Sequence, residues 1–233
     1  MSKMSYEQIG VAMTCRSYEE YVRMFDLEPS DLAHGEVLDV AAGGSSFTAE
    51  VNARGYSAYA VDPRYDAGIE KWITEAEQEI ETSTAKLAKL QENFDWSYYG
   101  SIEKHRAGRE TSIELFKSNV LDSKKSKRYL AGKLPELPFG DDQFSLILCS
   151  HFMFLYANQF GPEFHIHAIM DLMRICKPGG QIRIYPLISL DWKPYPELDQ
   201  LLDSIKANGG KTELCPSRLP FIPGSSHFLK ILL

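Results

Sequence analysis

A loop of small residues between two apolar segments, each ending near an aspartate, is the part of this sequence with the clearest chemistry. Asp39 precedes the loop, Gly43 and Gly44 lie within it, and Asp62 ends the second apolar segment. Glycine lets a backbone approach a ligand closely, and an acid about 20 residues beyond such a loop accepts hydrogen bonds from ribose hydroxyls. The spacing predicts a strand–loop–helix–strand unit that holds an adenosine-containing cofactor.

In this arrangement the chain resembles the class I S-adenosylmethionine-dependent methyltransferases, whose first strand ends in an acid before a GxGxG-like loop. Asp39 holds the position of that acid and Gly43 matches the middle glycine. Ala41 and Ser45 replace the outer two glycines, and Asp62 matches the family's ribose-binding acid. The resemblance implies S-adenosyl-L-methionine as the cofactor and S-adenosyl-L-homocysteine as its product.

Two later segments, residues 134–156 and 169–187, extend the resemblance. In the family such segments form the fourth strand, the helix after it, and a KPGG turn into the fifth strand. The resemblance implies an α/β, Rossmann-like fold with a doubly wound, mostly parallel, seven-stranded sheet and an antiparallel C-terminal strand. The implied cofactor contacts are Asp39, Ala41, Gly43, Gly44, Ser45, Asp62, Pro63, Lys133, Leu134 and Ser150.

Two positions depart from the family pattern. Family members commonly carry an acid, where this chain has Lys133, that accepts a hydrogen bond from the adenine amino group. A lysine cannot accept that bond, so either backbone groups near Leu134 hold adenine or the loop follows a different path. Within the fourth strand, Ser145 replaces the usual acid.

His151 is the candidate catalytic residue. Methyl transfer from a sulfonium requires the acceptor lone pair to be aligned with the methyl carbon, and a general base helps when the acceptor is a hydroxyl. His151 follows Ser150 at the predicted end of the fourth strand, and an ordinary histidine pKa near 6.5 suits a base at neutral pH. The alternative is a histidine with a structural or cofactor-contacting role.

The acceptor pocket is expected beside the same strand end. Candidate acceptor contacts are Tyr21, Phe152, Tyr156, Arg183 and Tyr185, with core packing as the alternative for Tyr21 and Tyr156. The (N/D)PP(Y/F) tetrapeptide, typical of enzymes that methylate nucleobase or glutamine nitrogens, is replaced by residues 150–153, SHFM. We therefore expect a small-molecule or peptide acceptor, with a hydroxyl or carboxylate favoured.

No metal site is expected from the sequence. The four cysteines form no CxxC motif. His165 and His167 are two residues apart on a predicted helix, where side chains two positions apart do not face each other.

Helices are predicted on both sides of the cofactor motif. Residues 1–30 form an N-terminal helical cap, in which Ser17 and Glu20 make a capping box. Strands at 36–40 and 58–61 flank a helix at 46–54.

A helical insertion separates the second strand from the third. Residues 66–92 carry apolar side chains at helical spacing, and a second helix is predicted at 96–120. Because residues 66–127 exceed what a connection needs, we expect a lid or acceptor wall, a dimerisation arm, or a role in packing only.

The remaining elements follow the expected alternation. They are strands at 128–131, 144–149 and 181–186, helices at 163–176 and 194–207, and a final strand pair at 211–216 and 228–232.

Composition agrees with a single domain spanning residues 1–233. A net charge of -7 argues against nucleic acid as a partner. The sequence contains no run of about 18 apolar residues, so no membrane span is expected. A cytoplasmic location is expected for the same reason. Two alternatives to a methyltransferase stay open: a cofactor-binding but non-catalytic interaction module, and an NAD-dependent oxidoreductase.

Overall fold

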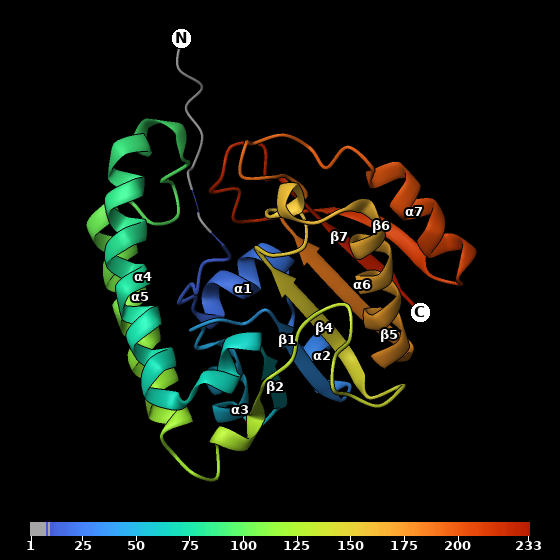
Figure 1. The fold of residues 1–233 in the computed structure, drawn as a ribbon, viewed down its shortest axis with the longest axis horizontal. Helices are drawn as coiled ribbons and strands as arrows, with labels where there is room; N and C mark the ends of the chain where they lie inside the picture. Colours follow the sequence, from blue (N-terminus) through green and yellow to red (C-terminus); the bar gives the residue numbers. More distant parts are fainter. Residues whose placement is uncertain (1–7, 9) are drawn as a thin grey trace.

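A seven-stranded sheet organises the chain, and its order is β3-β2-β1-β4-β5-β7-β6. The computed structural model describes residue 8 and residues 10–233 (Figure 1). The strands are β1 Glu36–Val40, β2 Ser57–Val61, β3 Tyr129–Leu130, β4 Phe144–Ser150, β5 Cys176–Tyr185, β6 Lys211–Pro216 and β7 His227–Leu232. The first five pair in parallel, and β7 is antiparallel to both β5 and β6. The predicted doubly wound sheet with an antiparallel C-terminal strand is confirmed.

Helices cover both faces of the sheet. On one face pack α1 Tyr18–Phe25, α2 Pro29–Ala33 and α3 Phe47–Ala53, and on the other α6 Pro162–Ile175 and α7 Leu198–Ala207. The predicted capping box begins α1, because Ser17 and Glu20 exchange hydrogen bonds with each other's backbone. Both faces of the parallel strands are therefore buried, as parallel sheets require.

The insertion consists of two antiparallel helices, α4 Ile69–Leu90 and α5 Ile102–Val120, which lie side by side near the β2–β3 edge of the sheet (Figure 1). Short 3-10 helices η1 Pro63–Ala67, η2 Gln91–Asn93 and η3 Ser126–Arg128 connect them to the rest. The second helix was predicted from residue 96, but it begins at Ile102. The physical reason is a cap: the Ser101 hydroxyl accepts a hydrogen bond from Lys104 N.

Two other predicted boundaries differ from the structure. Helix α7 begins at Leu198, because the preceding segment is held by a bridge between Ile188 and Pro194. The KPGG segment was expected to form a turn, but it lies inside β5. There the pairing of β4 with β5 shifts in register, from Phe144 opposite Cys176 to Leu146 opposite Gln181. Residues 177–180 therefore form an irregularity within the strand rather than a separate turn. After Tyr156, residues Ala157–Gln159 form one further 3-10 helix, η4.

Two features are absent from the described part of the chain. None of its helices is long and apolar enough to cross a membrane. Likewise, residue 8 and residues 10–233 contain no group of three or more His, Cys, Asp and Glu side chains arranged to hold a metal ion.

Candidate functional site

Two cavities lie at the carboxyl ends of the parallel strands, where open α/β sheets bind ligands. The larger, which we call the β2 cavity, measures about 360 Å³ and lies at the ends of β1 and β2. Of the predicted site residues, it is lined by Ala41, Asp62, Pro63, Lys133, Leu134 and Phe152. The smaller, which we call the β4 cavity, measures about 100 Å³ and lies beyond the end of β4. Of the predicted site residues, it is lined by His151, Tyr156 and Tyr185.

Asp62 ties the glycine loop to the wall of the β2 cavity. Its Oδ2 accepts a hydrogen bond from Gly43 N at 3.1 Å, and its Oδ1 accepts one from Arg64 N at 2.9 Å. Tyr65 Oη donates to Gly43 O at 2.6 Å and fixes the loop from the other side. Asp62 is only 3% exposed, and burial raises the pKa of its carboxyl group. A carboxylate has room for about four hydrogen bonds, so Asp62 keeps acceptor capacity for a ligand.

Ala41 adopts an unusual backbone conformation at the end of β1. Its φ of 55° lies in the left-handed region, which favours glycine. This is the position at which the methyltransferase pattern has its first glycine. A backbone held in this conformation beside a cavity is typical of ligand sites.

Lys133 lines the β2 cavity together with Leu134. Lys133 O accepts a hydrogen bond from Glu136 N at 3.1 Å, and the two residues form an isolated bridge. The structure thus places a lysine at the cavity position where the family pattern has an acid.

The rest of the glycine loop is covered by the chain itself. A Cβ on Gly43 would lie 3.2 Å from Thr14 N, and one on Gly44 would lie 2.9 Å from Cys15 Sγ. Ser45 Oγ donates to Arg16 O at 2.9 Å. We call residues 11–16 the strap, because they cross over this loop.

The strap also occupies the beginning of α3. Ser46 N donates to Arg16 O at 2.9 Å and to Ser112 Oγ of α5 at 3.2 Å. Ser45 Oγ accepts a hydrogen bond at 3.1 Å from Phe47 N, the first N–H of α3. The beginning of α3 is thus bonded to its own chain, through Ser45, the strap and the insertion.

Five predicted cofactor residues line neither cavity: Asp39, Gly43, Gly44, Ser45 and Ser150. Asp39 is fully buried, and its carboxyl group accepts a hydrogen bond from the Tyr21 hydroxyl. The Tyr21 oxygen lies 2.9 Å from Asp39 Oδ1 and 3.1 Å from Oδ2. Burial raises the pKa of Asp39 well above its ordinary value. Tyr21, predicted at the acceptor, is therefore bound to the core of the sheet.

His151 lies at the base of the β4 cavity, with its own φ of 54° in the left-handed region. Its N donates to Tyr185 O at 2.6 Å, and its Nδ1 lies 2.9 Å from Ser150 Oγ. Burial lowers the pKa of His151 well below its ordinary value, and the positive charges of Arg16 and Arg109 lower it further. The imidazole is therefore neutral at neutral pH.

The other predicted acceptor residues are divided between several places. The Tyr156 hydroxyl accepts a hydrogen bond from Ala12 N of the strap at 3.0 Å. The Tyr185 hydroxyl is bound to Leu219 O at 2.7 Å, although its ring lines the β4 cavity. Phe152 lines the β2 cavity instead.

Arg183 lines neither cavity. Its guanidinium donates to Phe25 O at 2.8 Å and to Asp31 Oδ1 at 2.7 Å, which fixes the turn between α1 and α2. Arg183 shares a face of β5 with Tyr185 but lies two residues, roughly 6–7 Å, further from the strand end. That distance places it under α1 rather than at the cavity.

The insertion supplies walls of the β4 cavity that the sequence analysis did not identify. Glu79, Ser83 and Leu87 of α4 lie four residues apart and face the cavity together. A signal was present, because Glu79 and Ser83 interrupt the apolar stripe of α4 with polar side chains. From the strap, Arg16 was also missed.

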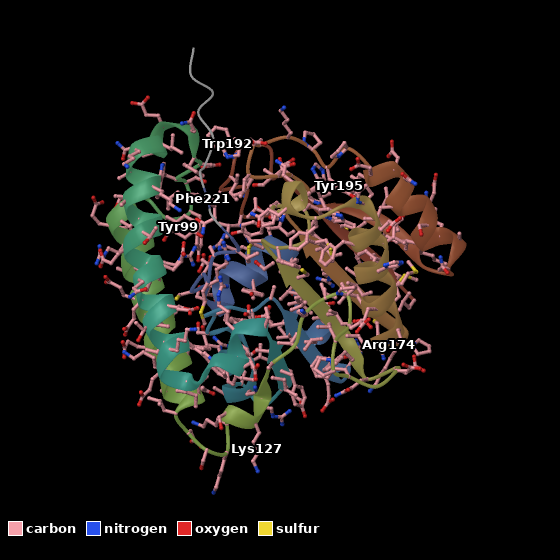
Figure 2. The ribbon with its side chains drawn as sticks, viewed as in Figure 1. Tyr99, Lys127, Arg174, Trp192, Tyr195 and Phe221 are labelled. Atoms are coloured by element: carbon pink, nitrogen blue, oxygen red, sulfur yellow. The ribbon has the colours of Figure 1, made fainter. Side chains whose placement is uncertain are left out.

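Aromatic side chains close the cavity between the insertion and the C-terminal loops. Tyr99, Trp192 and Phe221 lie close together there (Figure 2). The Tyr99 and Phe221 rings are 4.9 Å apart, and the Phe94 ring contacts both Trp192 and Phe221. Asp95 N also donates to Phe221 O at 3.0 Å. These rings form an apolar boundary of the β4 cavity.

Known proteins were compared with the chain. No family model matches it. The uncharacterised protein MJ0045 of Methanocaldococcus jannaschii is 34% identical over 203 residues, which cover 85% of this chain and 87% of that protein.

Solved structures of low sequence identity also align with the chain. A putative S-adenosyl-L-methionine-dependent methyltransferase of Methanococcus maripaludis is 14% identical, with a TM-score of 0.46, covering 92% of this chain and 82% of that one. A TehB-like methyltransferase of Corynebacterium glutamicum is 14% identical, with a TM-score of 0.45, covering 85% and 79%.

Proposed function

We propose that this chain, which belongs to the same family as protein MJ0045 of Methanocaldococcus jannaschii, is an S-adenosyl-L-methionine-dependent methyltransferase. Its sheet has the strand order of the class I methyltransferase fold. The observation that carries the proposal is the β2 cavity, where Asp62 is held by Gly43 N at the wall. Its volume of about 360 Å³ falls within the range of small-molecule sites. The acceptor we propose is a small molecule or a peptide, with a hydroxyl or carboxylate favoured.

The residues of the β2 cavity fit an adenosine group. Asp62 accepts hydrogen bonds from the two ribose hydroxyls, because each of its oxygens keeps a lone pair beyond its present backbone partner. Pro63, Leu134 and Phe152 give the cavity apolar surface on which a planar base can pack. When bound, S-adenosyl-L-methionine supplies a methyl group activated on a sulfonium sulfur.

His151 acts as the general base of this proposal. The Ser150 hydroxyl donates to Met24 Sδ at 3.8 Å, so its oxygen is available to accept the Nδ1 proton of His151. That arrangement leaves Nε2 of the neutral ring free to take the proton of an acceptor hydroxyl. Its lowered pKa keeps the ring unprotonated, and the proton then passes to solvent after transfer.

The insertion forms the acceptor wall in this proposal rather than only a dimerisation arm. Side chains of α4 and α5, together with Tyr99 between them, line the β4 cavity opposite His151. The aromatic boundary formed with Phe221 excludes water, which would otherwise compete with the acceptor.

Calorimetric titration with S-adenosyl-L-homocysteine tests the proposal. We expect micromolar binding by the parent chain, at least tenfold weaker binding by Asp62→Ala, and an intermediate loss for Asp62→Asn, which keeps one acceptor oxygen. Asp66→Ala, which removes an exposed acid in the 3-10 helix that Asp62 caps, is the matched control and should bind like the parent. Circular dichroism checks that each variant is folded.

Absence of binding by the folded parent would contradict the proposal. Binding without turnover on acceptors carrying hydroxyl, carboxyl, amine and thiol groups would instead favour a non-catalytic interaction module. A thermal shift with NADH alone would favour an oxidoreductase.

A further inference from the structure

Two oppositely charged side chains on the wall of the β4 cavity lack partners within residues 10–233. Arg16 lies on the strap and Glu79 on α4, and both line the cavity. The Arg16 carbonyl is hydrogen-bonded, but its guanidinium makes no ion pair or hydrogen bond with the described residues. One oxygen of Glu79, Oε1, is buried and also has no hydrogen-bond partner there.

Neighbouring charges are paired, which sets these two apart. Arg109, on the same cavity wall, is bound to Glu20 at 2.6 Å. Arg64 forms an ion pair with Glu75 at 3.3 Å. Arg16 and Glu79 do not form an ion pair with each other, since their side-chain nitrogen and oxygen atoms are more than 4.0 Å apart.

Burial without a partner is unfavourable for both groups. Burial raises the pKa of Glu79 and lowers the pKa of Arg16, the directions in which desolvation disfavours a charge. A ligand that brings a carboxylate to Arg16 and an ammonium to Glu79 removes both penalties at once. The group that carries both charges a short distance apart is the head group of an α-amino acid.

We propose that the β4 cavity binds the methyl acceptor through its α-amino-acid head group, with the carboxylate on Arg16 and the ammonium on Glu79. The inference rests on the proposed function and names its substrate class. The cavity of about 100 Å³ is smaller than the roughly 150 Å³ that holds a benzene molecule. The acceptor is therefore a small amino acid or a derivative with one compact side chain.

The acceptor atom belongs to the side chain of that amino acid. An ammonium bound to Glu79 has no lone pair, so a hydroxyl or thiol forms the new bond to the methyl carbon. The carbon–sulfur bond of the sulfonium breaks, its electron pair stays on sulfur as a neutral thioether, and the acceptor proton moves to His151.

Binding of amino acids to the full-length chain tests the inference. The probes are L-serine, L-cysteine and L-threonine, each beside its amide and its N-acetyl derivative, titrated with and without saturating S-adenosyl-L-homocysteine. We expect at least one free amino acid to bind tenfold or more tightly than either derivative. Arg16→Gln should remove the preference over the amide, and Glu79→Gln the preference over the N-acetyl form.

Matched controls are available on the exposed face of α7. Asp203→Asn and Lys206→Gln make the same charge changes in an exposed ion pair and should bind every probe like the parent. The comparison of free and derivatised probes uses only the parent chain, so it decides the inference even where a variant is unfolded.

Three results would overturn the inference. The first is parent protein that binds S-adenosyl-L-homocysteine but no free amino acid, which leaves the proposed function standing. The second is weaker binding of S-adenosyl-L-homocysteine by Arg16→Gln and Glu79→Gln, with unchanged binding of 5′-methylthioadenosine, which lacks the amino-acid group. That result would assign the two charges to the cofactor. The third is parent protein that binds neither S-adenosyl-L-homocysteine nor amino acids, and there the proposed function fails as well.

Discussion

Arg109 Nη1 lies 2.6 Å from Glu20 Oε2, and the two side chains are only 5% and 4% exposed. The ion pair joins α5 of the insertion to α1, which precedes the first strand. The same Nη1 donates to Cys15 O of the strap at 2.9 Å, and the Tyr99 hydroxyl donates to Glu20 Oε1 at 2.5 Å. Although burial alone would raise the pKa of Glu20, Arg109 holds it below its ordinary value. Strap, α1 and insertion are thus connected by one buried network.

Breaking this ion pair should be costly. Arg109→Met leaves the Glu20 carboxylate buried without its cation, and we expect a loss of about 3–5 kcal/mol in the free energy of unfolding. Urea denaturation measures the loss. Arg106→Met, on the same helix but at an exposed ion pair with Glu81, is the control and should change stability little. Equal losses in the two variants would contradict a special role for the buried pair.

Asp39 should make stability depend on pH. Because its folded pKa is raised well above 3.8, the folded chain holds a proton that the unfolded chain releases. The associated stabilisation is complete below pH about 4 and is lost as the pH rises through the folded pKa. Asp39→Asn should therefore gain stability relative to the parent as the pH rises from 4 to 8. Urea denaturation across this range would refute the prediction if the two chains keep a constant difference.

Ala41→Gly should stabilise the protein by up to about 1 kcal/mol. A left-handed conformation costs a residue with a Cβ roughly 1–2 kcal/mol, and the greater freedom of glycine in the unfolded chain offsets part of the gain. The opposite sign is expected for Ala53→Gly, at an exposed position in α3, where glycine costs roughly 0.5–1 kcal/mol. Thermal and urea unfolding of the pair measure both effects, and a destabilised Ala41→Gly would count against the assigned backbone strain.

Gly44→Ala and Gly108→Ala should also differ in sign. A Cβ on Gly44 would lie 2.9 Å from Cys15 Sγ and 3.0 Å from Ala76 Cβ, so we expect a loss of about 1–3 kcal/mol. A Cβ on Gly108, within α5, meets nothing within 4 Å, and alanine there should gain roughly 0.5–1 kcal/mol. Cys15→Ala should recover part of the Gly44→Ala loss. A Gly44→Ala chain as stable as the parent would show that the strap does not pack on the loop.

His151 should stay neutral well into the acid range. Its ring has a pKa well below 6.5, so its NMR signals should keep the shifts of neutral imidazole as the pH falls through 6.5. His151→Gln identifies these signals and should also reduce turnover by about 10²–10⁴-fold, while leaving affinity for S-adenosyl-L-homocysteine unchanged. A ring that titrates near 6.5 would contradict the lowering of the His151 pKa by burial, Arg16 and Arg109.

Much of the architecture was predictable because it follows from local patterns. The apolar segments before Asp39 and Asp62 predicted β1 and β2, and the capping box at Ser17 predicted the beginning of α1. Helix boundaries were less accurate where side-chain caps or tertiary bridges decided them. The beginning of α5 depends on Ser101, and that of α7 on the Ile188–Pro194 bridge.

The candidate site was predictable only in part. Ala41, Asp62, Lys133 and Leu134 meet in one cavity because the carboxyl ends of parallel strands share one edge of the sheet. Arg16 and Glu79 could not be placed beside His151 from the sequence, because no local periodicity relates residues so far apart.

The sequence alone therefore determined the strand–loop–helix–strand unit, the mostly parallel sheet and the presence of two long helices after β2. Hydrophobic periodicity and glycine chemistry act over a few neighbouring residues, which is why they can be read directly. Only the tertiary structure decided that the strap covers the glycine loop and that Glu79 and Ser83 of α4 line the same cavity as His151. Those arrangements depend on burial of charges such as Arg109 and Glu20, whose pairing exists only once distant segments have packed together.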